Sequence, residues 1–178
     1  MNAFDARALF AIYGGMHGRW APAMVVFTVL GAGWTAIGLV PLVWIARTRR
    51  VGLALAVAIA LQATLVWALK AAFGRVRPWL AFGLPAPIGQ PHDGSFPSGH
   101  AAGSFCVAAF VAVLLPAVWR SAPMRALLVS LFGVLVAAFV ALSRVYLGAH
   151  FPSDVLAGAL LGALVGVAGA KHYLSSRG

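Results

Sequence analysis

Long apolar runs separated by short polar stretches make up most of this chain. Five of these runs are near the length of about 20 residues that a helix needs to cross a membrane, and they cover residues 22–46, 51–69, 98–119, 123–146 and 152–173. Lipid cannot hydrogen-bond peptide groups, so a helix is the expected form of each run. The pattern therefore predicts an all-α, polytopic membrane helical bundle with five transmembrane helices.

Residues 1–20 are too polar to span a membrane, although apolar side chains such as Phe4 and Leu9 alternate there with charged ones. A segment of this kind predicts a short amphipathic helix that lies on the membrane surface and ends near Gly14. The first long apolar run begins late in the chain, so we expect no cleaved signal peptide. We expect residues 1–178 to form a single integral membrane domain.

The composition excludes an ordinary soluble domain. Of 178 residues, 62% are hydrophobic and 9% are charged, against about 25% charged residues in soluble domains. A net charge of +10 would favour a nucleic-acid partner in a soluble protein. Here the cations lie at the ends of apolar runs or inside polar motifs, which favours membrane topology and an anionic substrate instead. Cys106 is the single cysteine, which excludes a disulfide within the chain.

The basic residues also predict the orientation in the membrane. If successive turns alternate sides, one side carries Arg47, Arg49, Arg50, Arg120, Arg125, Lys171 and Arg177, and the other carries Arg7, Arg19, Lys70, Arg75, Arg77 and Arg144. The first side has the small excess of cations that is typical of the cytoplasmic face. We therefore expect a multi-pass protein of the cell membrane, the inner membrane in a bacterium, with residues 73–97 and 147–151 on the extracytoplasmic side.

The loop of residues 73–97 is longer than a connection needs, and such loops are often functional. It contains Trp79, Leu80, Phe82, Leu84 and Ile88 among several prolines. Two interpretations remain open: the loop rests on the membrane interface, or it forms an apolar lip that admits a lipid tail.

Acidic residues are very rare in this chain: Asp5, Asp93 and Asp154 are the only ones. Only Asp154 lies inside an apolar run, where an ionised side chain costs roughly 2.5–3.5 kcal/mol at a helix centre. His150 precedes it by four residues, so both share one helix face if Pro152 lies in the first turn of the helix. We expect His150 to be the partner of this carboxylate.

Two further motifs accompany this pair. Lys70 precedes Arg77 and Pro78 by six intervening residues, and on their own these cations are most simply interfacial side chains at a helix end. The sequence Pro97-Ser98-Gly99-His100 opens the third run. Its serine can cap the helix, and its glycine lets the backbone approach a ligand closely. The free N–H groups at the start of the helix and the helix dipole together form an anion site. An ordinary N-cap beside an interfacial histidine is the alternative.

All of these groups fall on the same side of the predicted bundle, and they come from four separate segments. They are Lys70, Arg77, Ser98, His100, Arg144, His150 and Asp154. Three cations against one carboxylate form a site for a dianion such as a phosphate, for which arginine offers bidentate contacts.

In this order the motifs resemble the type 2 phosphatidic acid phosphatase superfamily, which also includes vanadium haloperoxidases. Its signature, Lys-x6-Arg-Pro, Pro-Ser-Gly-His and Ser-Arg-x5-His-x3-Asp, is complete here between Lys70 and Asp154. The resemblance implies a metal-independent phosphatase with a helical core. Membrane members of that family commonly have six spans, which makes six the alternative to the five expected here.

The resemblance also implies a role for each site residue. His150 would attack phosphorus and form a phosphohistidine, Asp154 would hold the imidazole tautomer, and His100 would protonate the leaving oxygen and then activate water. The phosphate-binding groups would be Lys70, Arg77, Ser98, the Gly99 N–H and Arg144. A magnesium site would need carboxylates, which this chain hardly has, so we expect no metal and no cofactor.

The expected reaction is hydrolysis of a lipid phosphate or diphosphate at the extracytoplasmic face. Undecaprenyl diphosphate is the first candidate substrate, from its frequency in this family in bacteria; phosphatidylglycerol phosphate, phosphatidic acid and lipid A phosphate are alternatives. The same intermediate would also serve a lipid phosphotransferase. A haloperoxidase is less favoured because those relatives are soluble. A protein that only binds or moves an anionic lipid is disfavoured by the pairing of His150 with Asp154. The oligomeric state is not indicated.

The face of the last run that carries His150 and Asp154 continues with Gly158, Gly162 and Gly166. Small residues at this spacing let two helices approach closely. We hypothesise that this face packs tightly against the third or fourth run and holds the nucleophile in position. Packing without any catalytic consequence is the alternative.

Overall fold

All regular elements in the described part of the chain are helices. The computed structural model describes residues 3–32, 38, 40–86 and 92–176. Its helices are α1 (Ala3–Ile12), α2 (Ala21–Leu30), α4 (Val40–Trp44), α5 (Arg49–Phe73), α6 (Pro78–Ala81), α7 (Gly99–Val118), α8 (Pro123–Tyr146) and α9 (Pro152–Ser175). This agrees with the predicted all-α class.

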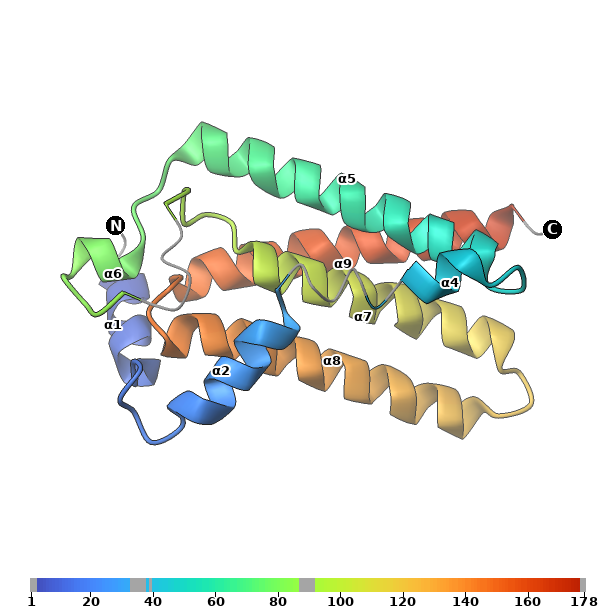
Figure 1. The fold of residues 1–178 in the computed structure, drawn as a ribbon, viewed down its shortest axis with the longest axis horizontal. Helices are drawn as coiled ribbons and strands as arrows, with labels where there is room; N and C mark the ends of the chain where they lie inside the picture. The colour runs from blue at the N-terminus through green and yellow to red at the C-terminus, as the bar shows by residue number, and fades with distance from the viewer. Residues whose placement is uncertain (1–2, 33–37, 39, 87–91, 177–178) are drawn as a thin grey trace.

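Helices α5, α7, α8 and α9 run side by side along the longest axis of the molecule (Figure 1). Helix α7 packs against α5, α8 and α9. The stretch Arg49–Ala81 and helices α7, α8 and α9 are long and apolar enough to cross a membrane. These four correspond to the second to fifth predicted spans.

The ends of these helices follow local sequence rules. Pro123 and Pro152 open α8 and α9, where the missing N–H of proline costs nothing. Ser98 caps α7, since its side chain accepts a hydrogen bond from the Ala101 N–H at 3.5 Å. Gly74 ends α5 with a left-handed backbone, φ 52°, a conformation that glycine adopts without steric cost.

The first predicted span is only partly described. Residues 22–46 contain α2, an apolar helix of ten residues, and the five-residue α4. Residues 33–37 and 39 lie outside the described part of the chain. The structure therefore confirms four of the predicted spans, and a total of five or six stays a prediction.

Helix α1 is docked on the protein rather than separate from it. The side chains of Asp5 and Leu9 are buried, and Leu9 packs in a core cluster with Val145 and Phe151. The predicted helix in the N-terminal segment is thus present, ending at Ile12. That it lies on a membrane surface stays a prediction.

Gly158, Gly162 and Gly166, which we call the glycine stripe of α9, face the backbone of α7. A Cβ atom at Gly158, Gly162 or Gly166 would lie 2.4, 2.0 or 2.2 Å from a carbonyl oxygen of α7 or its cap, those of Ser98, Ala102 and Cys106 respectively. Such distances leave no room for any larger residue. The hypothesised close packing against the third span is confirmed.

The two ends of the bundle differ in their chemistry. Figure 1 shows α4, the start of α5, the α7–α8 turn and the end of α9 at one end of the molecule. These segments carry Arg47, Arg49, Arg50, Arg120, Arg125 and Lys171. The motif residues lie toward the opposite end, so the predicted separation of the cations into two groups is present among the described residues; Arg177 lies outside them.

Candidate active site

Four separate segments bring the motif residues together at one end of the bundle. They are the end of α5 with the residues that follow it, residues 93–100, the end of α8, and the turn that leads into α9 together with the first turn of that helix. Figure 1 shows α1, α6 and the start of α9 near one another at this end. The eight predicted site residues all lie in these four segments.

His150 is held by the tight turn between α8 and α9. The backbone N–H groups of Ala149 and His150 both donate to the Arg144 carbonyl, at 2.9 and 3.1 Å. Gly148 makes this turn possible because its φ of +73° lies in the left-handed region. The His150 side chain is 2% exposed. The imidazole is therefore fixed in position before any ligand binds.

Arg77 determines which nitrogen of His150 carries the proton. Its buried guanidinium places Nη1 3.1 Å from Nε2 of His150. Arginine only donates hydrogen bonds, so Nε2 must be the acceptor and the proton lies on Nδ1. The unprotonated Nε2 has the lone pair that a nucleophile needs.

The charge state of His150 favours the same role. Burial lowers the pKa of His150 to about 4, and the nearby cations Arg77 and Arg144 act in the same direction. Asp154 opposes this shift but does not overcome it. The ring is therefore neutral at pH 7, although its ordinary pKa is near 6.5.

Asp154 lies behind His150 and is fully buried. Its Oδ2 is 3.7 Å from Nδ1 of His150, which is too far for a hydrogen bond. The hydroxyl of Ser95 stands between them, 2.5 Å from Asp154 Oδ2 and 3.5 Å from His150 Nδ1. The Phe151 N–H also donates to Oδ2, at 2.8 Å.

The expectation that His150 is the partner of Asp154 is therefore incomplete. The ion-pair partner is Arg75, whose Nη1 lies 2.6 Å from Asp154 Oδ1. Arg75 also binds Asp5 through Nη2 at 2.7 Å, and its guanidinium lies 4.3 Å from the centre of the Phe151 ring. A buried carboxylate needs such a cation nearby to stay charged.

Asp5 connects the N-terminal helix to this network. It accepts hydrogen bonds from the backbone N–H of Ser153 at 3.0 Å and from its hydroxyl at 2.6 Å. Burial would raise the pKa of Asp5, but the bonds from Ser153 and Arg75 outweigh it and lower that pKa. We call Asp5, Arg75, Ser95, Ser153 and Asp154 the rear network. Sequence reasoning assigned a role in the site only to Asp154.

On the other side of His150, two predicted phosphate ligands bind a carboxylate of the chain itself. Asp93 contacts Lys70 Nζ through Oδ2 at 2.8 Å and Arg77 Nη2 through Oδ1 at 2.6 Å. Burial acts against ionisation, but these bonds lower the pKa of Asp93 to about 2. Its side chain is 56% exposed. We call Lys70, Arg77 and Asp93 the front cluster.

The remaining predicted groups surround the same space. The Ser98 N–H donates to the Asp154 carbonyl at 2.9 Å, which ties the start of α7 to α9. His100 lies within electrostatic reach of Arg144, His150 and Arg77. Arg144 is buried and donates through Nη1 to Thr28 of α2.

Arg144 has a buried donor without a partner among the described residues. Its buried Nε has no hydrogen-bond partner within the described ranges. Buried donors are rarely left unpaired in native proteins, so this one calls for an explanation. A donor intended for a bound oxyanion provides one.

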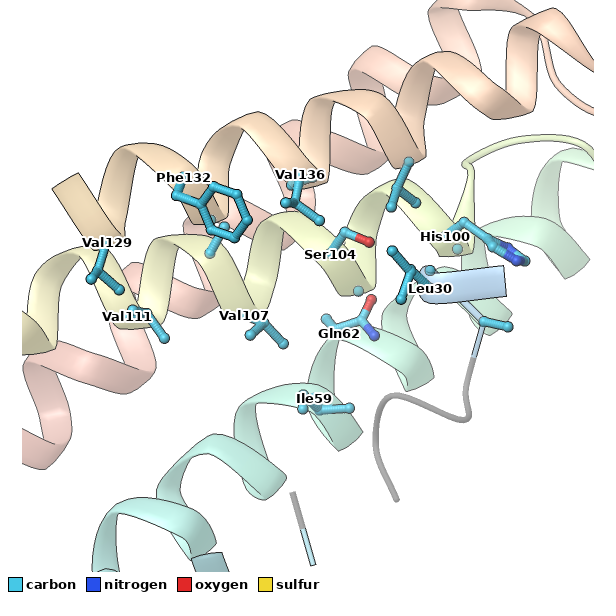
Figure 2. A pocket seen from close by; sticks show the side chains of 18 residues that line it. Leu30, Ile59, Gln62, His100, Ser104, Val107, Val111, Val129, Phe132 and Val136 are labelled. Atoms are coloured by element: carbon cyan, nitrogen blue, oxygen red, sulfur yellow. The ribbon is translucent and has the colours of Figure 1, made fainter. Parts of the chain in front are cut away.

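An apolar cavity opens next to His100. It has a volume of about 470 Å³ and is lined by residues of α2, α5, α7 and α8. Figure 2 shows His100 at one end of the lining residues, with Phe132 and Val129 toward the other. Gln62 and Ser104 add polar groups to a wall that is otherwise mostly apolar. A cavity of this size and lining suits part of a lipid chain.

Among the described residues, no group of three or more His, Cys, Asp or Glu side chains lies in a position to bind a metal ion. The polar groups that converge on His150 are mostly cationic. Such a donor set suits an oxyanion.

Comparisons with known proteins agree with this geometry. The sequence model of the PAP2 superfamily matches residues 51–175. An undecaprenyl-diphosphatase of Sulfolobus acidocaldarius is 32% identical over 121 residues, which are 67% of this chain and 53% of that protein. The chain spans about half the length of the curated relatives it matches.

Two solved structures have a similar fold. The crystal structure of a transmembrane PAP2-type phosphatidylglycerolphosphate phosphatase from Bacillus subtilis has a TM-score of 0.80 and 28% identity, covering 98% of this chain and 86% of that one. The crystal structure of Aquifex aeolicus LpxE has a TM-score of 0.77 and 27% identity, covering 96% of both chains. These likenesses extend over nearly the whole helical bundle.

Proposed function

The chain belongs to the PAP2 superfamily, the type 2 phosphatidic acid phosphatases that its motifs resemble, and from this premise we propose that it hydrolyses a lipid phosphate or diphosphate through a phosphohistidine on His150. The observation that carries the proposal is the 3.1 Å contact between Arg77 Nη1 and His150 Nε2. It supports a neutral imidazole whose unprotonated nitrogen lies beside the phosphate-binding cations.

In the first step, Nε2 of His150 attacks the terminal phosphorus and the bond from that phosphorus to the leaving oxygen breaks. The leaving oxygen belongs to the lipid alcohol in a lipid monophosphate and to the remaining lipid phosphate in a lipid diphosphate. His100, which carries a proton when the phosphate dianion is bound beside it, gives that proton to the leaving oxygen. The imidazole becomes positively charged as the N–P bond forms, and Asp154 stabilises that charge through Ser95. Preorganised charge of this kind is usually the largest catalytic contribution.

In the second step, His100 takes a proton from water, and the resulting nucleophile attacks phosphorus. The N–P bond breaks, inorganic phosphate leaves and neutral His150 is restored. During both steps the phosphate oxygens are held by Lys70, Arg77, Arg144, Ser98 and the Gly99 N–H. The unpaired Nε of Arg144 supports its place in this set.

The position of the cavity supports a lipid as the leaving group. His100 lines the cavity of about 470 Å³, so the lipid oxygen that it protonates would lie at the mouth of an apolar space. We assign the lipid chain to this cavity. The site faces the extracytoplasmic side because the opposite end of the bundle carries Arg49, Arg120 and Lys171, as a cytoplasmic face does.

Undecaprenyl diphosphate remains our first candidate substrate. The name of the Sulfolobus acidocaldarius relative supports it, while other relatives are named for phosphatidylglycerol phosphate, phosphatidate and lipid A. The substrate is therefore to be decided by assay. Phosphate transfer to an acceptor lipid would use the same intermediate and is recognised by its product.

The test is a panel of lipid phosphates given to the purified protein in detergent, with released phosphate and lipid products measured. We expect release from at least one substrate, inhibition by orthovanadate, and loss of activity in His150→Ala. His172→Ala is the matched control, because His172 is an exposed histidine near the far end of α9. No release from any member of the panel, or full activity in His150→Ala, would refute the proposal.

A further inference from the structure

Arg77 of the front cluster already has an acceptor in the protein for each of its donors. Arginine has five N–H donors, and in Arg77 the protein accepts from all of them. Nε donates to the Asp93 carbonyl at 3.0 Å, and Nη1 approaches the Ala149 carbonyl and His150 Nε2 at 3.0 and 3.1 Å. Nη2 donates to the Asp93 carboxylate at 2.6 Å and to the Gly94 carbonyl at 3.3 Å.

A phosphate oxygen can therefore gain a bond from Arg77 only by replacing one of these acceptors. The carbonyl groups are held in place by the backbone, and the Gly94 carbonyl also accepts from Lys70 Nζ at 2.7 Å. His150 Nε2 gives up its contact with Arg77 only when it attacks phosphorus. The Asp93 carboxylate is different. It is on a side chain that is 56% exposed, so rotation can carry it into water, where a carboxylate is well solvated.

Lys70 leads to the same conclusion. Its ammonium group is 12% exposed and binds the second oxygen of the same carboxylate at 2.8 Å. One side chain thus spans both cations, as two oxygens of a phosphate would. Removal of Asp93 would release Lys70 and Arg77 together.

We propose that Asp93 is a specificity-determining residue, whose carboxylate occupies the Lys70–Arg77 part of the phosphate site until a more highly charged phosphate displaces it. This inference rests on the proposed function. A terminal phosphate carries a charge of about −1.5 to −2 at pH 7, so it replaces the single charge of Asp93 with a gain. A phosphodiester carries only one charge, so the exchange brings no electrostatic gain and still costs desolvation.

This difference selects a substrate class. The bulk phospholipids around a membrane enzyme are phosphodiesters, and they would otherwise compete for the same cations. Asp93 lowers the occupancy of the site by these weakly bound diesters, whereas lipids that end in a phosphate monoester or a diphosphate bind strongly enough to displace it. The exchange is purely non-covalent, and the carboxylate returns when inorganic phosphate leaves.

The test compares two anions as ligands of the purified full-length protein. Inorganic phosphate represents the dianion and diethyl phosphate the monoanionic diester, with binding measured by isothermal titration calorimetry. In Asp93→Asn we expect both anions to bind more tightly than to wild type by a similar factor of up to about 5-fold, because the same partly exposed charge contact no longer has to open for either of them. Asp93→Glu keeps the charge and should keep the wild-type affinities.

His92→Asn is the matched control, because it changes the exposed neighbour of Asp93 and leaves the front cluster intact. Weaker binding of both anions to Asp93→Asn would overturn the proposal and make Asp93 a group that orients the two cations. Unchanged binding of both would also overturn it. Binding needs no turnover, so a wild type that discriminates between the anions but hydrolyses no lipid would refute the proposed function and leave this inference standing.

Discussion

The two carboxylate clusters on either side of His150 contain every acidic residue of the chain, and their surroundings are opposite. In the rear network Asp154 is fully buried and Asp5 is 4% exposed. In the front cluster the side chain of Asp93 is 56% exposed. A buried ion pair cannot open without leaving an uncompensated charge, whereas an exposed one opens at little cost. The rear network is thus suited to position a side chain and the front cluster to exchange an anion.

Arg75 and Arg77 are close in sequence but belong to different clusters. They are separated by one residue, yet Arg75 binds Asp5 and Asp154 in the rear network, and Arg77 binds Asp93 and contacts His150. Residue type and sequence position are nearly the same for the two arginines. Their roles differ because their partners come from different segments of the chain.

The largest effect is expected from removal of the rear cation. Arg75→Gln leaves fully buried Asp154 without its ion-pair partner, so we expect unfolding free energy to fall by about 3–5 kcal/mol and turnover to fall about 100-fold. Thermal melting in detergent and phosphate release measure the two effects. Arg125→Gln is the control, since that arginine lies over Trp119 at the other end of the bundle. Equal melting and turnover in both variants would show that the rear network is not needed.

The next effect concerns α9, the helix that carries Ser153 and Asp154 of the rear network. A Cβ atom at Gly162 would lie 2.0 Å from the Ala102 carbonyl oxygen, so Gly162→Ala must push α9 away from α7. We expect a loss of about 1–3 kcal/mol together with lower turnover.

Gly133→Ala on α8 is the matched control, because a Cβ there meets no atom within 4 Å. Alanine at this helical position should be neutral or stabilise the protein by up to about 1 kcal/mol. Similar melting temperatures for the two alanine variants would contradict the close packing of α7 and α9.

A smaller effect is expected from Ser95→Ala, which removes the hydroxyl between Asp154 and His150. A hydrogen bond to a charged group is worth about 1.5–3 kcal/mol, so turnover should fall about 10- to 100-fold while KM changes little. Ser130→Ala is the control, because its buried hydroxyl donates only to the Ala126 carbonyl within α8. A change in KM alone would place Ser95 in substrate binding instead.

The smallest effect is one of pH. Because burial and the cations lower the pKa of His150 to about 4, its nucleophilic neutral form is complete above that pH and is lost only as the pH falls through about 4. We therefore expect no titration of His150 between pH 5.5 and 8 in the ligand-free protein. Histidine NMR signals, assigned with His150→Ala, measure this. A titration midpoint near pH 6.5 would contradict this, because it would mean that the effect of Asp154 on the pKa of His150 cancels the effects of burial and of the cations.

Much of the fold could be predicted because it depends on local pattern. The expected bounds of 123–146 are those of α8, and those of 98–119 and 152–173 differ from α7 and α9 by one or two residues. Helix formation depends on neighbouring residues, on caps such as Ser98 and on openings such as Pro152. The close packing of the glycine stripe could also be predicted from the sequence, because a spacing of four residues places these glycines on one face of α9.

The ion-pair partners of the charged residues could not be predicted from the sequence in this way. Asp5 was assigned to a surface helix, and Asp93 was not expected to occupy the phosphate site. Arg75 pairs with residues 70 and 79 positions away, and no pattern of apolar spacing connects such residues. Ser95 gave no signal, because a single serine before a helix start is common.

The sequence alone thus predicted five apolar helices, of which the described structure contains four long ones, and it predicted that two imidazoles and three cations meet at one end of the bundle. Only the tertiary structure decided which carboxylate is buried, which is exposed, and which cation each one binds. The physical reason is that helix formation is a local property, whereas the strength and permanence of an ion pair depend on the solvent that the whole fold leaves around it.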